Sequence, residues 1–488
     1  MSDARLGRWW LAAIVFGLIR FTVVAIDYQS LGEDPDAYRA IAEGWSASGT
    51  VGRLSPDGSV AATAYRPPLY PWLLSWFASD NGLWLPGVAG LHILLGSLTC
   101  LLTLDITKRL LSSRPSSRLS PRDELLEVPE SQPKLKPVRT LEFASRREAT
   151  TMIPWLAGLA VAFDPILLRQ SCLVMTETTA TFMSILIWWF WIVALRNYTG
   201  RALQFSFGFI GILLGISCLL RPTTLVWCVL LVVALFKHTW RMPRPERRIA
   251  FSFSKAIFLA MGVVLVLSPW AIRNRMEFGS TIWTTTHGGY TLLLANNPVI
   301  FQHLEVEGIS RDWDEGRFHE LWSHRTQQDP REPGFWTDRN EYENAPKHIL
   351  DEINDDRLAN QVAWATIVRS PWTFVKASFA RTLWLWALWP FQEEASPLLT
   401  ILVGVWYFAI LSLFAYGSMR AAYNWFSRSY SSASESDWLP AVALIIGLAA
   451  VHAVYWSNMR MRAPVMPMVV VIAAISLSKS QRLLSERT

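Results

Sequence analysis

Long apolar stretches recur along the chain, and polar connections separate them. A helix needs about 20 apolar residues to cross the hydrocarbon core of a bilayer. Ten stretches approach this length and are predicted to span the membrane: 9–26, 84–106, 150–168, 172–195, 202–220, 222–238, 251–270, 397–418, 438–456 and 463–479. The pattern therefore predicts an all-α polytopic membrane protein with about ten transmembrane helices. The first stretch is longer than the core of a signal peptide, so we expect an anchor that is not cleaved.

The composition agrees with this class of protein. Hydrophobic residues make up 51% of the 488 residues and charged residues only 17%, against about 25% in an average soluble domain. The net charge of +6 is explained by basic loops. No zinc-finger or other nucleic-acid-binding pattern accompanies it, so no nucleic-acid partner is expected. The cysteines form no CxxC pair, which predicts neither a disulfide framework nor a zinc site; they are Cys100, Cys172, Cys218 and Cys228.

Lysine and arginine set the expected orientation of the chain. The connection 107–149 holds ten of them, and the connection after the sixth predicted span holds five. Both connections fall on the same side as the two termini, and basic loops mark the cytoplasmic side of a membrane protein. Residues 107–149 are also rich in serine, proline and mixed charge, which is typical of a mobile insertion.

The opposite, outer side receives two large segments. One is the first outer loop, 27–83, and the other is the polar stretch 271–396, which is long enough to form a small folded cap. We therefore expect an N-terminal transmembrane module at 1–270, an outer region at 271–396 and C-terminal transmembrane helices at 397–488. Within the outer region, the tryptophan-rich segment 371–390 is either a further span or an interfacial helix.

Glu177 lies inside the fourth predicted span, within a turn or two of its outer end. A carboxylate at such a position costs about 2.5 kcal/mol or more, so an ionisable residue inside the membrane is a candidate for function. The alternative is a structural role, in which the carboxylate interacts with Thr176, Thr178 or a neighbouring arginine.

Several arginines fall on the outer side, against the usual bias: Arg221, Arg273, Arg275, Arg460 and Arg462. The planar fork of donors in arginine suits phosphate. Each arginine taken alone is equally well explained by contacts with lipid headgroups or with a helix C-terminus. As a set that shares one surface with Asp34 and Glu177, they favour an anionic ligand.

The first outer loop opens with the acidic segment GEDPDAY, 32–38. Asp34 followed by Pro35 is a common helix start, with Asp34 as the N-cap. Asp36 would then lie on a different face, because residues two apart on a helix do not face each other. A capping aspartate is ionised and held in place, so capping and catalysis are compatible.

Two further outer segments contribute weaker candidates. The segment YRPPLYPW, 65–72, is predicted as a short interfacial helix, because tyrosine and tryptophan favour that level of the bilayer. It brings Arg66 close to the expected site. His287, in the outer region, is a candidate for a ligand contact, although a loop histidine is more often only a loop histidine.

Seven short motifs in this order give the sequence a resemblance to a known group. They are DPDAYRAIA (34–42), YRPPLYPWLL (65–74), TET (176–178), LLRPT (219–223), SPWAIRN (268–274), GGYTLLLANNP (288–298) and RMRAPVMP (460–467). The chain resembles the GT-C superfamily of glycosyltransferases, in the branch with protein O-mannosyltransferases and the aminoarabinose transferase that acts on lipid A. The motifs are spread over nearly the whole chain.

The resemblance implies an inverting transfer of a sugar from a polyprenyl phosphate to an acceptor on the outer face of a bacterial inner membrane, facing the periplasm. It implies Asp34 as the catalytic carboxylate and Glu177 as a second catalytic carboxylate, where the lipid A enzymes tend to carry aspartate. Arg460 and Arg462 match by position as contacts to the lipid phosphate. The full set of substrate-binding residues that we expect is Asp36, Tyr38, Arg66, Arg221, Arg273, His287, Arg460 and Arg462.

Several alternatives stay open at the level of the sequence. The acceptor is a protein, lipid A or another glycan, and membrane lipids are further partners. A divalent metal is possible, in which case Asp34, Asp36 and Glu177 are its ligands; no other cofactor is indicated. The main rival function is a transporter or flippase of lipid-linked sugars, but the two halves of the chain show no similarity of the kind that such proteins carry. A non-catalytic scaffold would leave Glu177 and the outer arginines unexplained.

Overall fold

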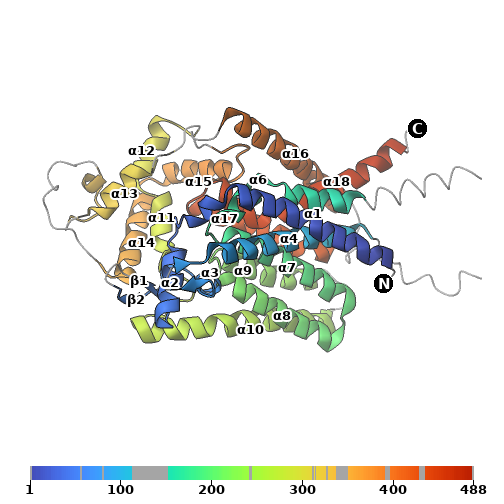
Figure 1. Cartoon of the computed structure of the whole chain (residues 1–488), viewed down its shortest axis with the longest axis horizontal. Helices are drawn as coiled ribbons and strands as arrows, with labels where there is room; N and C mark the ends of the chain where they lie inside the picture. Colours follow the sequence, from blue (N-terminus) through green and yellow to red (C-terminus); the bar gives the residue numbers. More distant parts are fainter. Residues whose placement is uncertain are drawn as a thin grey trace, which may run out of the picture.

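The structure is a computed structural model that describes residues 3–54, 58–79, 82–112, 152–240, 245–309, 313, 315–325, 328–336, 350–390, 396–427 and 435–485. Most of the predicted cytoplasmic insertion, 107–149, lies outside these ranges. In Figure 1 both chain ends lie at one end of the molecule, and the helices of the outer region gather at the other end.

The chain is a multi-pass membrane protein. In the described part, eight helical segments are long and apolar enough to cross a bilayer: Gly7–Ile26, Leu85–Leu111, Glu177–Asn197, Gly200–Cys218, Phe253–Phe278, Pro397–Tyr423, Ser436–Val454 and Met459–Ser478. They belong to α1 (Asp3–Ile26), α4 (Leu85–Leu111), α7 (Glu177–Asn197), α8 (Gly200–Cys218), α10 (Pro245–Phe278), α16 (Pro397–Ser427), α17 (Leu439–Val454), which follows η4 (Glu435–Trp438), and η5 (Met459–Val465) with α18 (Met466–Ser485).

The two other predicted spans are also helical but irregular. The stretch 150–168 is a bent pair, Met152–Ala162 and α6 (Pro165–Ser171), with a 50° angle between the two helices. The stretch 222–238 corresponds to α9 (Thr224–Trp240), whose apolar part, Thr224–Phe236, falls short of a full span. The described part of the chain therefore has a helix at each of the ten predicted positions, but only eight of these helices, or nine with the bent pair, are long and apolar enough to span a membrane.

A buried arginine stabilises the bend before α6 by donating hydrogen bonds to backbone carbonyls on both sides of it. Pro165 has no N–H, so the carbonyl oxygen of Val161, four residues earlier, loses its usual donor. The side chain of Arg20, in α1, is 1% exposed and donates to the carbonyl oxygens of Val161 at 2.9 Å and Leu167 at 2.8 Å. Freed backbone groups inside a membrane protein must be satisfied by such neighbours. Arg20 thereby fixes α1 against the broken span.

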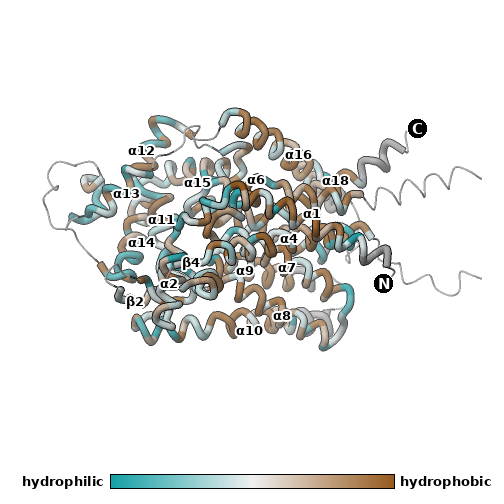
Figure 2. Tube along the Cα trace, in the orientation of Figure 1, coloured by the Kyte–Doolittle hydropathy of each residue, from teal (hydrophilic) through white to brown (hydrophobic). Residues whose placement is uncertain are grey.

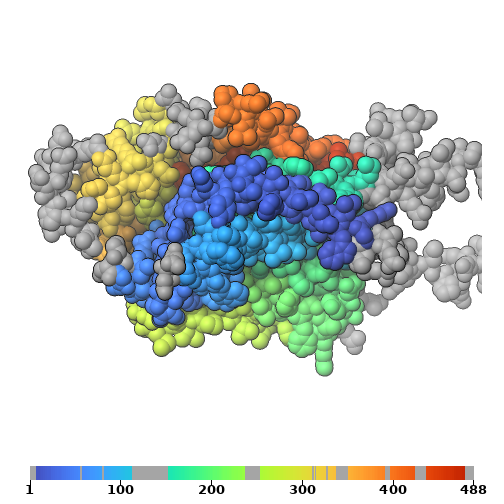
Figure 3. Space-filling view, in the orientation of Figure 1, coloured from blue at the N-terminus to red at the C-terminus, as the bar shows by residue number. Residues whose placement is uncertain are grey.

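Hydropathy along the chain separates two regions (Figure 2). The tube is mainly brown along α1, α8, α10 and α16, and mainly teal around α13. In α16 only 11% of the apolar window is buried inside the protein, and in α1 only 22%. Figure 3 shows α1 running across one face of the molecule. Apolar helices with such exposed surfaces fit contact with lipid rather than with water.

Helices α8 and α10 pack backbone to backbone. A Cβ atom added at Gly211 would lie 2.1 Å from the carbonyl oxygen of Leu259, and one at Gly262 would lie 2.3 Å from that of Gly208. Small residues allow this close approach between helices in a membrane, where van der Waals packing drives association. The glycines therefore determine how closely the two helices pack.

This packing predicts different effects for two glycines of α8. We expect Gly211→Val to lower the stability of the detergent-solubilised protein by about 1–3 kcal/mol, because its side chain has no space. Gly208→Ala is the matched control, since its added Cβ would meet the Phe258 ring at an ordinary 3.5 Å. Thermal unfolding followed by size-exclusion chromatography measures both. Equal melting temperatures for the two variants would contradict this account of the packing.

The outer region has a hydrophobic core of its own. Its elements are α11 (Gly288–Ala295), α12 (Pro298–Val306), α13 (Gly316–Ser323), η3 (Pro333–Trp336), α14 (Glu352–Arg369) and α15 (Pro371–Leu385). The core includes the buried side chains of Trp313, Phe318, Trp322 and Trp336. At 15 residues, α15 is about 22 Å long, shorter than a hydrocarbon core of about 30 Å. Its length favours the interfacial alternative for 371–390.

The first outer loop folds against both neighbouring regions. It contains η1 (Tyr28–Gly32), α2 (Tyr38–Ser48) and α3 (Leu69–Ser75), with two small antiparallel hairpins, β1 (Gly52–Leu54) with β2 (Val60–Ala62) and β3 (Ala78–Ser79) with β4 (Gly82–Leu83). Glu352 of α14 accepts hydrogen bonds from the Thr63 hydroxyl at 2.6 Å and the Ala64 amide at 2.9 Å. These contacts hold the loop against the outer region.

Candidate active site

Five segments that are distant in the sequence meet in a cluster of charged side chains. They are the turn before α2, the turn before α3, the start of α7, the turn after α8, and η5. We call the side chains Asp36, Arg66, Glu177, Arg221 and Arg460 the charged cluster.

The charged cluster alternates in sign. Arg66 Nη2 lies 2.9 Å from Asp36 Oδ1, and Arg460 Nη2 lies 3.7 Å from Asp36 Oδ2. On the other side of Arg460, its Nε lies 3.9 Å from Glu177 Oε1, and Arg221 Nη1 lies 3.4 Å from the same oxygen. The structure therefore brings five of the predicted site residues together. Three guanidinium groups face two carboxylates, a formal charge of +1.

Glu177 is the first residue of α7, so the predicted start of this span at 172 is five residues too early. Its side chain is 2% exposed. The N-terminal end of a helix carries a partial positive charge that favours a carboxylate. Its second oxygen, Oε2, is buried and accepts no hydrogen bond from the described part of the chain. Helix start and arginine partners together explain how the carboxylate is tolerated at this depth.

Two arginines of the cluster, Arg221 and Arg460, are only weakly satisfied. Arg460 Nη1 donates to the sulfur of Met175 at 3.1 Å, and Arg221 Nη2 donates to the sulfur of Met461 at 3.0 Å. A thioether is a weak acceptor. In the described part of the chain, Arg460 Nε and Arg221 Nη1 are buried without a hydrogen bond. Their donors are thus available to a better acceptor, such as a phosphate oxygen.

Asp34 lies at the edge of this cluster, and the predicted helix start at Asp34 is wrong. The helix α2 begins at Tyr38, and Ala37 occupies the N-cap position. Asp34 Oδ2 instead accepts a hydrogen bond from the Ala40 amide at 3.2 Å, across the turn. Its other oxygen, Oδ1, is buried and accepts no hydrogen bond within the described residues. Sequence reasoning identified the carboxylate but not the turn that holds it.

Ala37 explains why the helix starts late. It has φ 60° and ψ 25°, and it is the only residue other than glycine with positive φ in the described ranges. A non-glycine residue in this conformation costs about 1–3 kcal/mol, and such residues concentrate at functional sites. The left-handed turn separates Asp36 from the helix, and Asp36 then meets Arg66 and Arg460.

The same conformation gives a prediction for stability. Ala37→Gly is expected to raise the stability by up to about 1 kcal/mol, because glycine adopts positive φ without a steric clash. Ala37→Val is expected to lower it by about 1–3 kcal/mol, because a β-branched side chain clashes most strongly in that region. Melting temperatures of the two variants provide the measurement. An order of stability with valine above glycine would mean that the left-handed turn is absent.

Aromatic side chains support the cluster from beneath. The Arg66 guanidinium stacks on Tyr38 at 5.4 Å, and Tyr38 packs edge-on against Tyr70 at 5.2 Å. The hydroxyl of Tyr70 hydrogen-bonds to His92 Nε2 at 2.9 Å, while His92 Nδ1 lies 3.0 Å from the carbonyl oxygen of Ser171. Because a carbonyl only accepts, Nδ1 carries the proton and Nε2 accepts from Tyr70. Burial raises the pKa of both tyrosines, so they stay neutral.

Tyr70 and His92 were not among the predicted site residues; His92 was expected only as a packed or hydrogen-bonded histidine, and the structure shows its hydrogen bonds. Tyr70 lies within the predicted interfacial segment, four positions after Arg66. This short spacing was the one signal in the sequence that it lies near Arg66. Nothing in the sequence relates it to His92, which belongs to a different helix.

His287 lies one aromatic layer away from the charged cluster. Arg66 stacks on Tyr65 at 4.9 Å, and the Tyr65 and His287 rings are 4.4 Å apart. Burial, together with the positive charge of Arg66, lowers the pKa of His287 well below its usual value. The imidazole is therefore neutral at pH 7. Its Nδ1 is buried without a hydrogen bond in the described part of the structure.

Two of the predicted ligand-binding arginines serve other contacts. Arg273 Nη1 donates to the carbonyl oxygen of Thr63 at 3.0 Å, and its Nη2 to that of Val51 at 2.7 Å, so it ties α10 to the first outer loop. Arg462 is fully buried; its Nη1 donates to the carbonyl oxygens of Leu385 at 3.0 Å and Ala387 at 2.7 Å. Backbone carbonyls thus occupy two nitrogens of Arg273 and the Nη1 of Arg462, while Nε and Nη2 of Arg462 are buried without a hydrogen bond in the described part of the chain. Neither arginine joins the charged cluster.

The carboxylates do not fit a metal centre in this arrangement. No group of three or more His, Cys, Asp or Glu side chains in the described part of the chain is placed to hold a metal ion. Asp36 and Glu177 are each in contact with two guanidinium groups, whose positive charge repels a cation. The predicted metal alternative at Asp34, Asp36 and Glu177 is therefore disfavoured, and the cluster suits an anion.

No protein-family model and no curated protein sequence match the chain. Solved structures do. The archaeal oligosaccharyltransferase AglB from Archaeoglobus fulgidus, in complex with an inhibitory peptide and a dolichol-phosphate, matches with a TM-score of 0.50 and 14% identity over 100% of this chain and 52% of AglB. Its apo form matches with a TM-score of 0.50 and 14% identity over 100% of this chain and 53% of AglB.

A third match is ArnT from Cupriavidus metallidurans bound to undecaprenyl phosphate, with a TM-score of 0.37 and 14% identity over 95% of this chain and 78% of ArnT. The fold assignment rests on the AglB structures, of which this chain spans about half the length. They confirm the expected fold class, an all-α polytopic membrane protein with a GT-C-like fold.

Proposed function

We propose that this chain is an integral-membrane glycosyltransferase that moves a sugar from a polyprenyl-phosphate-linked donor to an acceptor on the outer face of a bacterial inner membrane. The observation that carries the proposal is a buried Asp34 oxygen that accepts no hydrogen bond within the described residues, beside a cluster with a surplus arginine. One carboxylate is therefore available for a proton while the arginines are available for phosphate.

The arginines would bind the phosphate of the donor. Arg221 and Arg460 exchange a weak thioether acceptor for phosphate oxygens, which form charge-assisted hydrogen bonds. Glu177 holds both guanidinium groups in position from below. Arginine stabilises the charge that develops on a departing phosphate without a change in its own protonation.

The carboxylates divide into two roles. Asp36 is held by Arg66 and Arg460, and Glu177 by Arg221 and Arg460, so both position arginines. Within the described residues, the Asp34 side chain accepts a hydrogen bond from the Ala40 amide and from no other group. Asp34 is thus the base of the proposed reaction, because a carboxylate engaged by two guanidinium groups is a poor proton acceptor.

The proposed step is a single displacement. The acceptor oxygen or nitrogen forms a bond to the anomeric carbon, and its proton passes to Asp34. The bond between the anomeric carbon and the phosphate oxygen breaks, and its electron pair stays on the polyprenyl phosphate. Attack opposite the leaving group inverts the anomeric centre. Burial raises the pKa of Tyr38 and Tyr70, so both stay neutral beside the cluster.

The fold neighbours agree with this choice of donor class. AglB has been solved with a dolichol-phosphate and an inhibitory peptide, and the match covers 52% of its length. For this chain the acceptor stays a protein, lipid A or another glycan. The basic connections that the sequence predicts on the cytoplasmic side support an orientation of the site toward the periplasm.

The test is a transfer assay with membranes that contain the full chain and a radiolabelled sugar on polyprenyl phosphate. We expect the label to move to an endogenous acceptor while an equal amount of polyprenyl phosphate is released. In proteoliposomes, movement of the intact donor across the bilayer without any transfer would identify a flippase and refute the proposal.

A further inference from the structure

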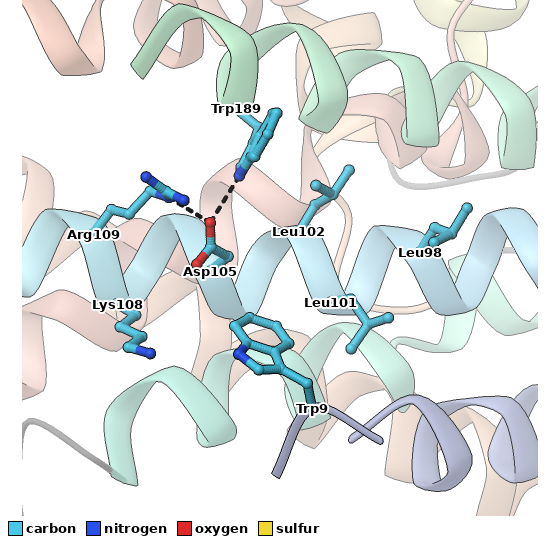
Figure 4. Close-up of a pocket in the computed structure, with 8 residues that line it drawn as sticks. All are labelled: Trp9, Leu98, Leu101, Leu102, Asp105, Lys108, Arg109 and Trp189. Atoms are coloured by element: carbon cyan, nitrogen blue, oxygen red, sulfur yellow. Dashed lines mark hydrogen bonds and ion pairs between the residues drawn. The ribbon is translucent and has the colours of Figure 1, made fainter. Parts of the chain in front are cut away.

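A groove lies at the end of α4 that is remote from the charged cluster (Figure 4). It has a volume of about 460 Å³ and is lined by Trp9, Leu98, Leu101, Leu102, Asp105, Lys108, Arg109 and Trp189. Lys108 is 16 positions after His92, which corresponds to about 24 Å along the helix axis. The groove is therefore separate from the site described above.

One face of α4 forms the floor of the groove. Its lining residues recur at helical spacing, from Leu98 to Arg109, and so share that face. Trp9 of α1 and Trp189 of α7 form the two walls, on opposite sides of α4 in Figure 4. The floor from Leu98 to Lys108 is about 15 Å long, half of a hydrocarbon core of about 30 Å. A groove of this length fits an acyl chain within one leaflet.

The groove changes from apolar to charged along its length. Its leucines lie at one end, and Asp105, Lys108 and Arg109 lie at the other, nearer the end of the helix. Tryptophan and basic side chains are typical of the level where lipid headgroups begin. The order of these residues follows the order of a phospholipid, with its chains inside and its headgroup outside.

The charges at the headgroup end are distributed unequally. Asp105 Oδ2 accepts from Arg109 and, at 2.8 Å, from the Trp189 indole. The other Asp105 oxygen points away from both donors in Figure 4. Lys108 is exposed, and its ammonium lies 5.7 Å from the centre of the Trp9 ring. The groove thus offers the Lys108 ammonium, with its three N–H donors, and the Asp105 oxygen that accepts from neither Arg109 nor Trp189.

We propose that this groove binds a phospholipid whose headgroup carries both a phosphate and a primary ammonium, as in phosphatidylethanolamine. Lys108 binds the phosphate, and the outward oxygen of Asp105 accepts a hydrogen bond from the ammonium. One acyl chain lies along Leu98, Leu101 and Leu102. The site is independent of the proposed transferase activity, and it gives α1, α4 and α7 a shared lipid contact.

The chemistry of the headgroup makes the proposal specific. A quaternary ammonium, as in phosphatidylcholine, has no N–H to donate to Asp105. A glycerol headgroup, as in phosphatidylglycerol, carries no positive charge for the carboxylate. A charge-assisted hydrogen bond contributes about 1.5–3 kcal/mol, which corresponds to a preference of about tenfold or more.

Native mass spectrometry of the detergent-solubilised full chain tests the site. With equimolar phosphatidylethanolamine, phosphatidylcholine and phosphatidylglycerol added, we expect about tenfold more of the ethanolamine lipid to be retained. Lys108→Met is expected to lower that retention by about tenfold, because the phosphate loses its cation. Leu101→Trp is expected to abolish it by filling the floor of the groove.

Leu94→Trp is the matched control, since Leu94 lies on the same helix, is 55% exposed and does not line the groove. It should retain as much lipid as the wild type. Equal retention of the three lipids, or retention that Lys108→Met leaves unchanged, would overturn the proposal. Lys108 is exposed, so its substitution tests the site even if Leu101→Trp fails to fold.

Discussion

Asp34→Asn is expected to lower the rate of sugar transfer by about 10²–10⁴-fold, the usual range for removal of a general base. Asparagine has nearly the same shape as aspartate, and its side-chain oxygen still accepts from the Ala40 amide. It cannot take the proton of the acceptor. Donor binding should stay unchanged, because the arginines that bind phosphate are intact. Initial rates in membranes with matched amounts of protein measure the effect.

Glu33→Gln is the control for Asp34→Asn. Glu33 is the exposed neighbour in the same loop and belongs to none of the contacts of the charged cluster. We expect its rate to equal that of the wild type. If Asp34→Asn transferred sugar at the wild-type rate, the role of Asp34 would be structural, through its contact with Ala40, and another residue would have to be the base. A rate that is low in both variants would point to the loop rather than to one carboxylate.

Arg460→Gln is expected to weaken binding of the polyprenyl-phosphate donor by about 10–100-fold, since each charge-assisted hydrogen bond contributes about 1.5–3 kcal/mol. Arg460 is the only described side chain that contacts both Asp36 and Glu177, so its loss also leaves two carboxylates closer to mutual repulsion. Arg460→Lys should recover only part of the affinity, because lysine keeps the charge and loses the planar fork. Binding of labelled donor to the purified protein measures this.

Two other arginines provide the comparison. Arg39→Gln removes a partly exposed pair with Glu43 in the first outer loop, and pairs of this kind contribute about 0–1 kcal/mol. It should bind donor as the wild type does. Arg462→Gln should lower the melting temperature, because Arg462 is fully buried and bonded to backbone carbonyls, without a selective loss of donor affinity. Equal donor affinity for Arg460→Gln and the wild type would remove Arg460 from the phosphate site.

The position of His287 shows how a weak signal in the sequence can gain meaning. A loop histidine alone indicates little. In the structure the centre of its ring lies 4.4 Å from that of Tyr65 and 5.0 Å from that of Tyr290. Tyr65 in turn stacks against Arg66 of the charged cluster. Neither contact could be read from the sequence, since more than 200 residues separate Tyr65 from His287.

The sequence by itself determined the class of the protein, because the length and hydrophobicity of each span are local properties. It also singled out Asp34, through the resemblance of its motif, and Glu177, since a carboxylate inside an apolar stretch is costly and therefore conspicuous; their catalytic roles stay predictions. It could not locate helix ends that depend on a distant partner or on an unusual backbone conformation. The break before α6 is stabilised by Arg20 of α1, and the late start of α2 depends on the left-handed Ala37.

Only the tertiary structure decided which arginines belong to the charged cluster. Arg460 and Arg462 are two residues apart in the same motif, yet the first contacts Asp36 and Glu177 while the second bonds to carbonyl oxygens of Leu385 and Ala387. A short 3₁₀ segment, η5, directs the two side chains to different sides. The fork of donors is the same in both; what differs is the acceptor that the fold places in front of each, and a sequence motif does not contain that acceptor.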